Sequence, residues 1–199
     1  ANYFSQIYLH DFNAGQSSRV TDGLSHAADP AFGDGYLYFT ASVNTGPSQV
    51  GLDLSTQERP LRQGIYAVVL SASGKSPLLT ETGDEAVTDK TDNSKDNKDK
   101  ADGKDEKKAA VKPVQIDLAG LNQRIVPLPL PEKNYSGLKV AADGALWLLE
   151  RPQPGSSNAG PTADNTNSAE LHRFDFKERK AAMVKNGLAD YQLSADGKQ

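Results

Sequence analysis

The sequence contains no cysteine, which excludes disulfide bonds and thiolate chemistry from its 199 residues. Hydrophobic residues are also scarce, at 37% of the chain, and no apolar run approaches the length of a membrane span. The net charge of −4 is too small to suggest nucleic acid as a partner. Residues 1–20 have neither the basic start nor the apolar stretch of a signal peptide. The length still permits one domain with a sizeable core.

Helical periodicity is missing as well. No stretch repeats apolar residues at the 3.6-residue period of an amphipathic helix, so we expect few helices. The chain has instead short apolar strands and three Asp-Gly pairs, at 34–35, 143–144 and 196–197. The first two lead into the apolar runs 36–42 and 145–151, whereas only two residues follow the third. Because glycine adopts positive φ without steric cost, each pair predicts a β-hairpin turn.

The chain repeats itself around these turns in three partial units. Each unit opens with an alternating strand that carries aromatic residues, followed by a polar turn and a second short strand that ends near a glycine. A further strand then leads to the Asp-Gly pair. The opening strands are 7–12, 65–70 and 171–176, the second strands are 19–23, 78–83 and a run ending at Gly187, and the strands before Asp-Gly are 26–35, 135–144 and 190–197.

Four short antiparallel strands are the content of one propeller blade. The strand after each of the first two Asp-Gly pairs is apolar on both faces, which is typical of a strand buried between stacked sheets. We therefore expect an all-β partial β-propeller over residues 1–199, with about three blades or blade parts; a two-sheet sandwich is the alternative. The residues expected on opposite faces are Tyr36, Tyr38 and Thr40 against Leu37, Phe39 and Ala41, and Trp147 and Leu149 against Leu146 and Leu148.

Two segments interrupt the repeat. Residues 84–112 form a low-complexity insertion that mixes acidic and basic side chains and has no aromatic residue, and residues 152–168 are rich in Pro, Gly, Ser and Asn. Neither can bury enough apolar surface to offset its ordering entropy, so both are predicted to be loops between strands or at blade junctions. We expect limited proteolysis to cut first within 84–112, and deletion of that segment to leave thermal unfolding nearly unchanged.

No pattern in the sequence predicts catalysis. A G-x-S-x-G nucleophile elbow and an HExxH motif are both missing, and the three histidines, His10, His26 and His172, are widely separated. His10 and His172 occupy related strand positions, which favours a structural role in the repeat. For His26, three residues before Asp29, we expect a polar contact. We expect no catalytic, cofactor-binding or metal-binding residue in this chain and no cofactor.

Two ligand-binding patterns are incomplete. The aspartates within 84–112 suggest a calcium loop, but with Gly103 at the sixth position, Lys98 and Lys100 stand where ligands are needed, which favours a solvated linker. Gly74-Lys75-Ser76 resembles the end of a phosphate-binding loop, but Val69 replaces the earlier glycine. A hairpin turn followed by a strand is the better interpretation there.

The segment 115–131 contains an acid and a base seven residues apart, Asp117 and Arg124. We expect them to pair across a hairpin and fix its register, although either could instead line a surface that contacts a partner or peptide. Pro127, Pro129 and Pro131 follow in alternation with leucines. Because proline cannot donate a ladder hydrogen bond, this stretch is predicted to be an edge or crossing segment.

Two long segments, 36–78 and 113–150, resemble the second, C-terminal propeller of Tricorn-type proteases, which are serine peptidases of the tail-specific protease clan. The more distinctive pattern is I-D-x-x-G-L-x-x-R-I-x-x-L-P at 116–129, followed by N-Y-x-x-L at 134–138. The elements around 29–39 also occur in Tol-type propellers. The resemblance covers the chain outside the two low-complexity segments, and the charged insertion departs from the family pattern.

The resemblance implies a non-catalytic propeller segment that guides or gates peptide substrates toward a catalytic core outside this chain. The family's catalytic serine lies in a later half that also includes a PDZ domain, and none of its motifs is found here. The implied partners are peptide or protein substrates and the protein's own catalytic and PDZ domains, with no nucleic acid and no membrane; a homo-oligomer would also fit. The implied location is cytoplasmic, or periplasmic if a signal peptide precedes Ala1.

Two other classes of protein remain open at this point. A Tol-like propeller would bind another protein and have no protease activity, whereas a propeller hydrolase would carry its own α/β-hydrolase domain. The sequence after Gln199 discriminates them. A PDZ-like region with a serine-containing core supports the protease, and a G-x-S-x-G motif supports the hydrolase.

Overall fold

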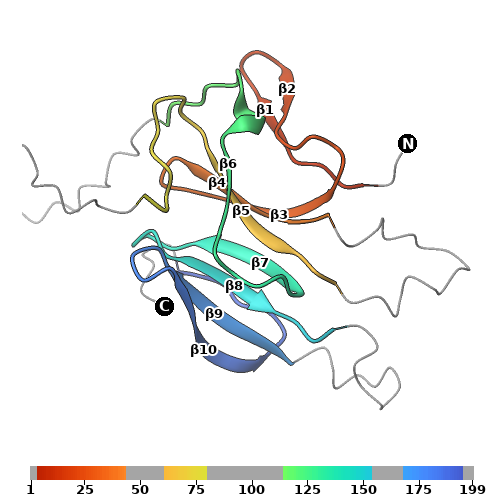
Figure 1. Cartoon of the computed structure of the whole chain (residues 1–199), viewed down its shortest axis with the longest axis vertical. Helices are drawn as coiled ribbons and strands as arrows, with labels where there is room; N and C mark the ends of the chain where they lie inside the picture. Colours follow the sequence, from red (N-terminus) through yellow and green to blue (C-terminus); the bar gives the residue numbers. More distant parts are fainter. Residues whose placement is uncertain (1–3, 44–60, 80–113, 154–167, 195–199) are drawn as a thin grey trace, which may run out of the picture.

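The computed structural model describes residues 4–43, 61–79, 114–153 and 168–194, and in these residues it consists of antiparallel β-sheets and one short 3₁₀ turn, Leu121–Gln123. None of the helical structure in these ranges is long and apolar enough to cross a membrane. Figure 1 shows three sheets in succession, with the N-terminal hairpin at one end. The hairpin is β1 (Tyr8–Asp11) and β2 (Gln16–Arg19). The second sheet is β3 (His26–Gly33), β4 (Tyr36–Ser42), β5 (Gly64–Val69) and β6 (Ile125–Pro127), and the third is β7 (Tyr135–Val140), β8 (Leu146–Glu150), β9 (Ala169–Asp175) and β10 (Lys180–Leu188).

Each four-stranded sheet is a meander, in which strands neighbouring in sequence are neighbours in space. The predicted Asp-Gly turns at 34–35 and 143–144 connect the first strand of each sheet to the second. In the second sheet Gly33 pairs with Tyr36, which leaves a two-residue loop. In the third sheet Val140 pairs with Leu146, so the loop is longer. This arrangement confirms the all-β fold and four strands as the repeating unit.

The repeat predicted from the sequence is out of phase with the sheets. Its opening strands became β1, β5 and β9, and in the four-stranded sheets β5 and β9 are the third strands. A predicted unit therefore begins in one sheet and ends at the second strand of the next. The opening strands were predicted correctly, whereas the second strand predicted at 19–23 is observed earlier, at Gln16–Arg19, inside the segment expected to be a polar turn. The sequence contains no signal for where one sheet closes, because hydrogen bonding between strands decides that boundary.

The strand predicted at 78–83 is wrong in the part that the structure describes. Leu78 and Leu79 belong to a turn and its exit, and 80–83 lie outside the described residues. The fourth strand of the second sheet is instead β6, which pairs only with β5 and forms the sheet's edge. The edge position of the Pro127 segment is confirmed. β6 follows the insertion in sequence, and its β-branched residues Ile125 and Val126 favour a strand. The run at Leu78 instead follows Pro77, which cannot donate a hydrogen bond to a sheet.

The alternating burial predicted for β4 and β8 is confirmed. Tyr38 packs in the core between the second and third sheets, whereas Leu37 and Phe39 pack in a core beneath the β1–β2 hairpin. In β8, Leu148 faces the second sheet and Leu149 faces the opposite side. A strand buried on both faces needs a neighbouring layer on each side, and the stacked sheets provide one for β4.

The first strands of the two large sheets touch each other. A Cβ atom added to Gly33 of β3 would lie 2.6 Å from the Cβ of Val140 in β7, and one added to Gly144 would lie 3.0 Å from Asp34 Oδ2. Each strand also contains a bulge with one residue at positive φ, Asp29 in β3 and Gly137 in β7. The two Asp-Gly turns therefore lie side by side, as expected at the inner edge of neighbouring blades.

The third repeat continues this pattern in the residues that the structure describes. The Tyr191 hydroxyl donates to the Gly137 carbonyl at 2.6 Å, and the Lys139 ammonium donates to the Tyr191 carbonyl, so this segment packs on β7. Residues 190–194 form no strand, which corrects the prediction for 190–197 over this part. The pair 196–197, the segment 84–112 and most of 152–168 lie outside the described residues.

Candidate functional site

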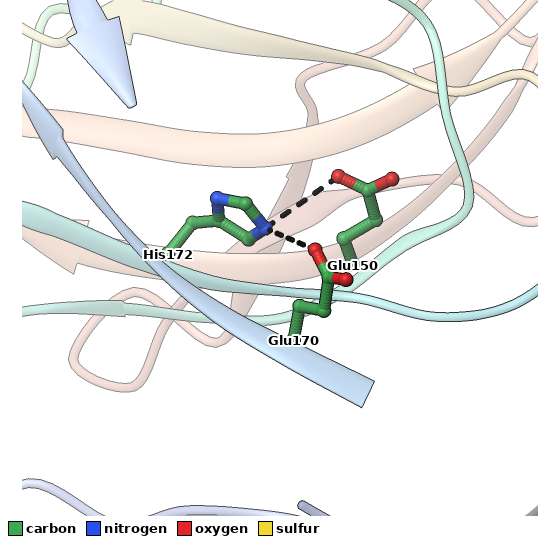
Figure 2. A group of neighbouring side chains, drawn as sticks. All are labelled: Glu150, Glu170 and His172. Carbon is green, nitrogen blue, oxygen red and sulfur yellow. Dashed lines mark hydrogen bonds and ion pairs between the residues drawn. The ribbon is translucent and has the colours of Figure 1, made fainter. Parts of the chain in front are cut away.

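A polar cluster lies where β8 ends and β9 begins. Glu150 and Glu170 are directly opposite each other across these strands, and Glu170 and His172, two positions apart, lie on one face of β9. Figure 2 shows both carboxylates beside one ring nitrogen of His172, and this Nε2 atom lies 3.2 Å from Glu170 Oε2 and 3.6 Å from Glu150 Oε2. Lys133 adds an ammonium group 2.7 Å from Glu150.

This cluster could hold a divalent cation, because its three ligand atoms lie within 4.8 Å of one another. Like charges opposite each other on neighbouring strands are destabilising. Lys133 and His172 relieve that repulsion by an ion pair and a hydrogen bond, so the cluster is also explained as charge pairing within the sheet. The Glu-x-His spacing was visible in the sequence, whereas the approach of Glu150 depends on the β8–β9 register.

The three histidines remain far apart in sequence and make separate local contacts. His10 Nδ1 lies 2.9 Å from the Ser17 hydroxyl across the β1–β2 hairpin. His26 Nδ1 accepts a 3.4 Å hydrogen bond from the Ser5 backbone, which is a polar contact of the kind predicted. His172 lies in β9, the strand that matches the His10 strand β1 in the repeat. A turn forms near Gly74, whose N–H donates to the Ser71 carbonyl, but no strand follows it at Leu78 and Leu79, so the hairpin predicted there is wrong in the described residues.

Asp117 and Arg124 do not form the side-chain pair predicted for them. The Asp117 carboxylate accepts the Ala72 N–H at 2.7 Å, and this bond is the largest cause of the lowered pKa of Asp117. The Arg124 guanidinium donates to backbone carbonyls, including those of Val69 at 2.9 Å, Leu70 and Asp117 itself. The two residues therefore fasten the end of β5 to the turn before β6 through the backbone.

The distinctive sequence pattern at 116–129 has a structural explanation at four of its fixed positions, those of Asp117, Gly120, Leu121 and Arg124. Gly120 adopts a left-handed φ of 66° at the start of the 3₁₀ turn, a conformation that costs glycine little. Leu121 is 3% exposed in the core beneath the hairpin. With the backbone contacts of Asp117 and Arg124, these residues allow the chain to return to β5 as the edge strand β6.

A cleft of about 450 Å³ opens between the second and third sheets beside the two Asp-Gly turns. Asp143 closes one side, where its carboxylate pairs with the Arg173 guanidinium at 2.9 Å, and Arg173 also lies 3.6 Å from Asp175. Hydrogen bonds from the Ala145 backbone and from Arg173 lower the pKa of Asp143. The other side of the cleft is formed by Asp34, Tyr36 and Tyr38, and Phe176 lies against Tyr38.

The tyrosines of this cleft stay protonated at neutral pH. Burial raises the pKa of Tyr38, and the neighbouring Tyr36 and Asp34 raise it further. Burial also raises the pKa of Tyr36, whose hydroxyl donates to the Lys75 carbonyl at 2.9 Å. The sequence identified the turn and the strand but not the cleft, because Arg173 is brought to Asp143 only by the pairing of β8 with β9.

Comparison with known proteins gives local similarity to two long relatives. Over 88 residues the chain is 36% identical to Tricorn protease homolog 1 of Streptomyces coelicolor, a match that covers 43% of this chain and 8% of the relative. Over 87 residues it is 30% identical to the putative tricorn protease homolog 2 of the same organism, covering 42% and 7%. The chain thus spans less than a tenth of the length of these relatives. No family model matches the chain.

The fold is similar to part of a solved structure, the crystal structure of the tricorn protease. The match has a TM-score of 0.61 and 19% sequence identity, and it covers 98% of this chain and 17% of that one. An identity this low supports the fold alone, and the fold agrees with the propeller predicted from the repeat. Sequence and fold both lead to Tricorn-type proteins, and this chain resembles a β-propeller segment of that family.

Proposed function

We propose that this chain is a non-catalytic part of the C-terminal propeller of a Tricorn-like serine protease, where it guides or gates peptides on their way to a catalytic core outside these residues. The observation that carries the proposal is the agreement of sequence and fold: two Tricorn protease homologues match locally, and the solved tricorn protease matches over nearly the whole chain. Peptide substrates, a PDZ domain and a cytoplasmic location belong to the same proposal.

The position of the Asp-Gly turns supports a guiding role. β3 and β7 lie against each other, and the turns that follow them lie side by side. In a propeller the first strands of the blades surround the central channel. A peptide that passes through the channel would meet these strands, whereas β10, at the opposite edge of its sheet, would be remote from it.

The test uses the protein in its natural length and a bulky label near the channel. Ala142 is exposed in the turn after β7, and no cysteine occurs in these 199 residues, so Ala142→Cys can be modified with a polymer-bearing maleimide. We expect the label to slow hydrolysis of long peptides severalfold and to leave short fluorogenic peptides unaffected. Met183→Cys, in the exposed part of β10, is the matched control and should change neither rate.

Two results would contradict the proposal. Equal rates for labelled and unlabelled Ala142→Cys with long peptides would place the path of the substrate elsewhere. A natural-length protein with no peptidase activity on any peptide would instead indicate a propeller that only binds another protein.

A further inference from the structure

We propose that the cleft between the second and third sheets binds a basic peptide side chain, with the arginine guanidinium or lysine ammonium held by the Asp34 carboxylate and by the aromatic rings beside it. The inference deepens the proposed function and rests on it, since it names the class of peptide that this segment would hold. The cleft volume of about 450 Å³ suits a side chain with part of its backbone.

The two Asp-Gly turns differ in how their carboxylates are paired. Asp143 of the third sheet is neutralised by Arg173, which stands opposite Trp147 on β9. In the second sheet, Tyr38 takes the position of Trp147, and the residue opposite it is Ala67, which has no charge. Asp34 accordingly has no ion pair or hydrogen bond within the described part of the chain. The repeat therefore contains one turn carboxylate that is satisfied internally and one that is available to a ligand.

The hydroxyl of Tyr38 is a second group that a ligand in the cleft can contact. Tyr38 is 2% exposed and lines the cleft, and no hydrogen bond joins its hydroxyl to another described residue. The oxygen atom itself is not sealed from the cleft, because the fully buried side-chain atoms without a partner in the described residues are Gln63 Oε1 and Trp147 Nε1. By contrast, the partly buried Tyr135 and Tyr191 hydroxyls donate to the carbonyls of Pro131 and Gly137. The Tyr38 oxygen is thus open to a ligand in the cleft and is not committed to a protein partner there. In this cleft a bound cation could donate a hydrogen bond to the Tyr38 oxygen.

The aromatic side of the cleft suits a cation as well. The Tyr38 ring lies 6.0 Å from the Tyr36 ring and 5.7 Å from the Phe176 ring, centroid to centroid. Rings that flank a carboxylate attract guanidinium and ammonium groups through their negative faces, and the attraction is larger where water is partly excluded. An apolar ligand would leave the Asp34 charge and the Tyr38 hydroxyl without a partner.

The other charges of the cleft do not cancel that of Asp34. Arg173 is engaged by Asp143 and Asp175, and Lys177 is exposed beside Asp175, whose pKa is lowered chiefly by the backbone N–H groups of Glu178 and Lys177. Three carboxylates thus face two cations among the residues that line the cleft, which leaves a net negative charge. A cationic group is therefore preferred over a neutral or anionic one.

The experiment compares two peptides that differ in one charge. A blocked pentapeptide with a central arginine and its isosteric citrulline counterpart are titrated into the full chain by isothermal calorimetry. We expect the arginine peptide to bind at least about tenfold more tightly, which corresponds to one charge-assisted contact with aromatic support. Asp34→Asn should remove that difference by weakening only the arginine peptide.

Two further variants separate binding from folding. Tyr38→Phe removes only the unpartnered hydroxyl, so we expect thermal unfolding to be unchanged while the affinity for the arginine peptide falls severalfold. Asp11→Asn changes the net charge equally but lies in the β1–β2 hairpin, and it should leave the affinity unchanged.

Three outcomes would overturn the inference. Equal binding of the arginine and citrulline peptides would leave the proposed peptide path standing but exclude a cation site in the cleft. Binding of neither peptide would also reject the site, while the labelling experiment at Ala142 would still decide the proposed function. A fully folded Asp34→Asn variant with unchanged preference for arginine would place the cation elsewhere.

Discussion

At the residue scale, folding shifts the pKa values of Asp29 and Asp143 in opposite directions. Burial raises the pKa of Asp29, although a hydrogen bond from the Gly137 backbone partly offsets that effect. A carboxyl whose pKa is higher in the folded than in the unfolded state disfavours folding once it is ionised. The free-energy cost of burying the ionised Asp29 carboxylate is therefore present at neutral pH and disappears as the pH falls below the ordinary pKa of 3.8.

We expect Asp29→Asn to raise the free energy of unfolding at pH 7 and to lose this advantage in acid. Asparagine is neutral and tolerates the positive φ of 50° at this position, so the backbone should not be strained. Urea unfolding at pH 7 and at about pH 3 measures the effect. A variant less stable than the parent at pH 7 would show that the ionised carboxylate contributes more through its hydrogen bond than it costs through burial.

Asp143→Asn should show the reverse behaviour. The folded state lowers the pKa of Asp143, so its stabilisation is present above pH 3.8 and is lost as the pH falls through the lower folded value. Because the carboxylate and Arg173 are both partly exposed, we expect a loss of only about 0.2–1 kcal/mol at pH 7. The same urea series is the measurement, and an equal loss at low pH would mean that the charge is not the cause.

At the element scale, Arg124 holds the return of the chain from β5 to β6. Its guanidinium donates to the carbonyls of Val69, Leu70, Ala119 and Asp117, and those of Val69 and Leu70 lie at the end of β5. The planar group can reach several acceptors at once, which a lysine ammonium on its flexible stem cannot.

We therefore expect Arg124→Ala to lower the free energy of unfolding by about 1.5–3 kcal/mol, the usual value for hydrogen bonds to a charged group. Arg124→Lys should recover little of this loss. Arg179→Ala is the control, because Arg179 is exposed and donates to one carbonyl, that of Leu78, and its loss should stay within about 0.5 kcal/mol. Full recovery by lysine would show that charge, rather than the geometry of the contacts, is what matters.

The apolar strands that follow the first two Asp-Gly turns were predictable because they depend on local patterns. Apolar alternation located both faces of β4 and β8, and Asp-Gly located two turns. The identity of the fourth strand was not predictable, because β6 is separated from β5 by the long insertion and competes with the run after Pro77. The cleft could not be foreseen either, since the pairing of Arg173 with Asp143 depends on the register of β8 and β9.

At the scale of the whole molecule, the contact of Gly33 with Val140 sets how closely the two large sheets approach. An added Cβ atom at Gly33 would overlap the Val140 side chain, so Gly33→Ala should destabilise the protein by about 1–3 kcal/mol, the usual cost of overpacking. Val140→Ala in the same chain makes room, and we expect it to reverse part of the loss. Thermal unfolding of the two single variants and the double variant gives the coupling. Purely additive effects would mean that the sheets do not meet at this point.

The central claim is that these residues are neighbouring blades in the propeller of a Tricorn-like protein. An electron cryo-microscopy structure of the natural-length protein tests it most directly. We predict that β3 and β7 line a central channel and that a further four-stranded sheet covers the face of β8 that carries Trp147 and Leu149. If β3 and β7 lie on the outer surface, or if that face of β8 is open to solvent, the account is contradicted.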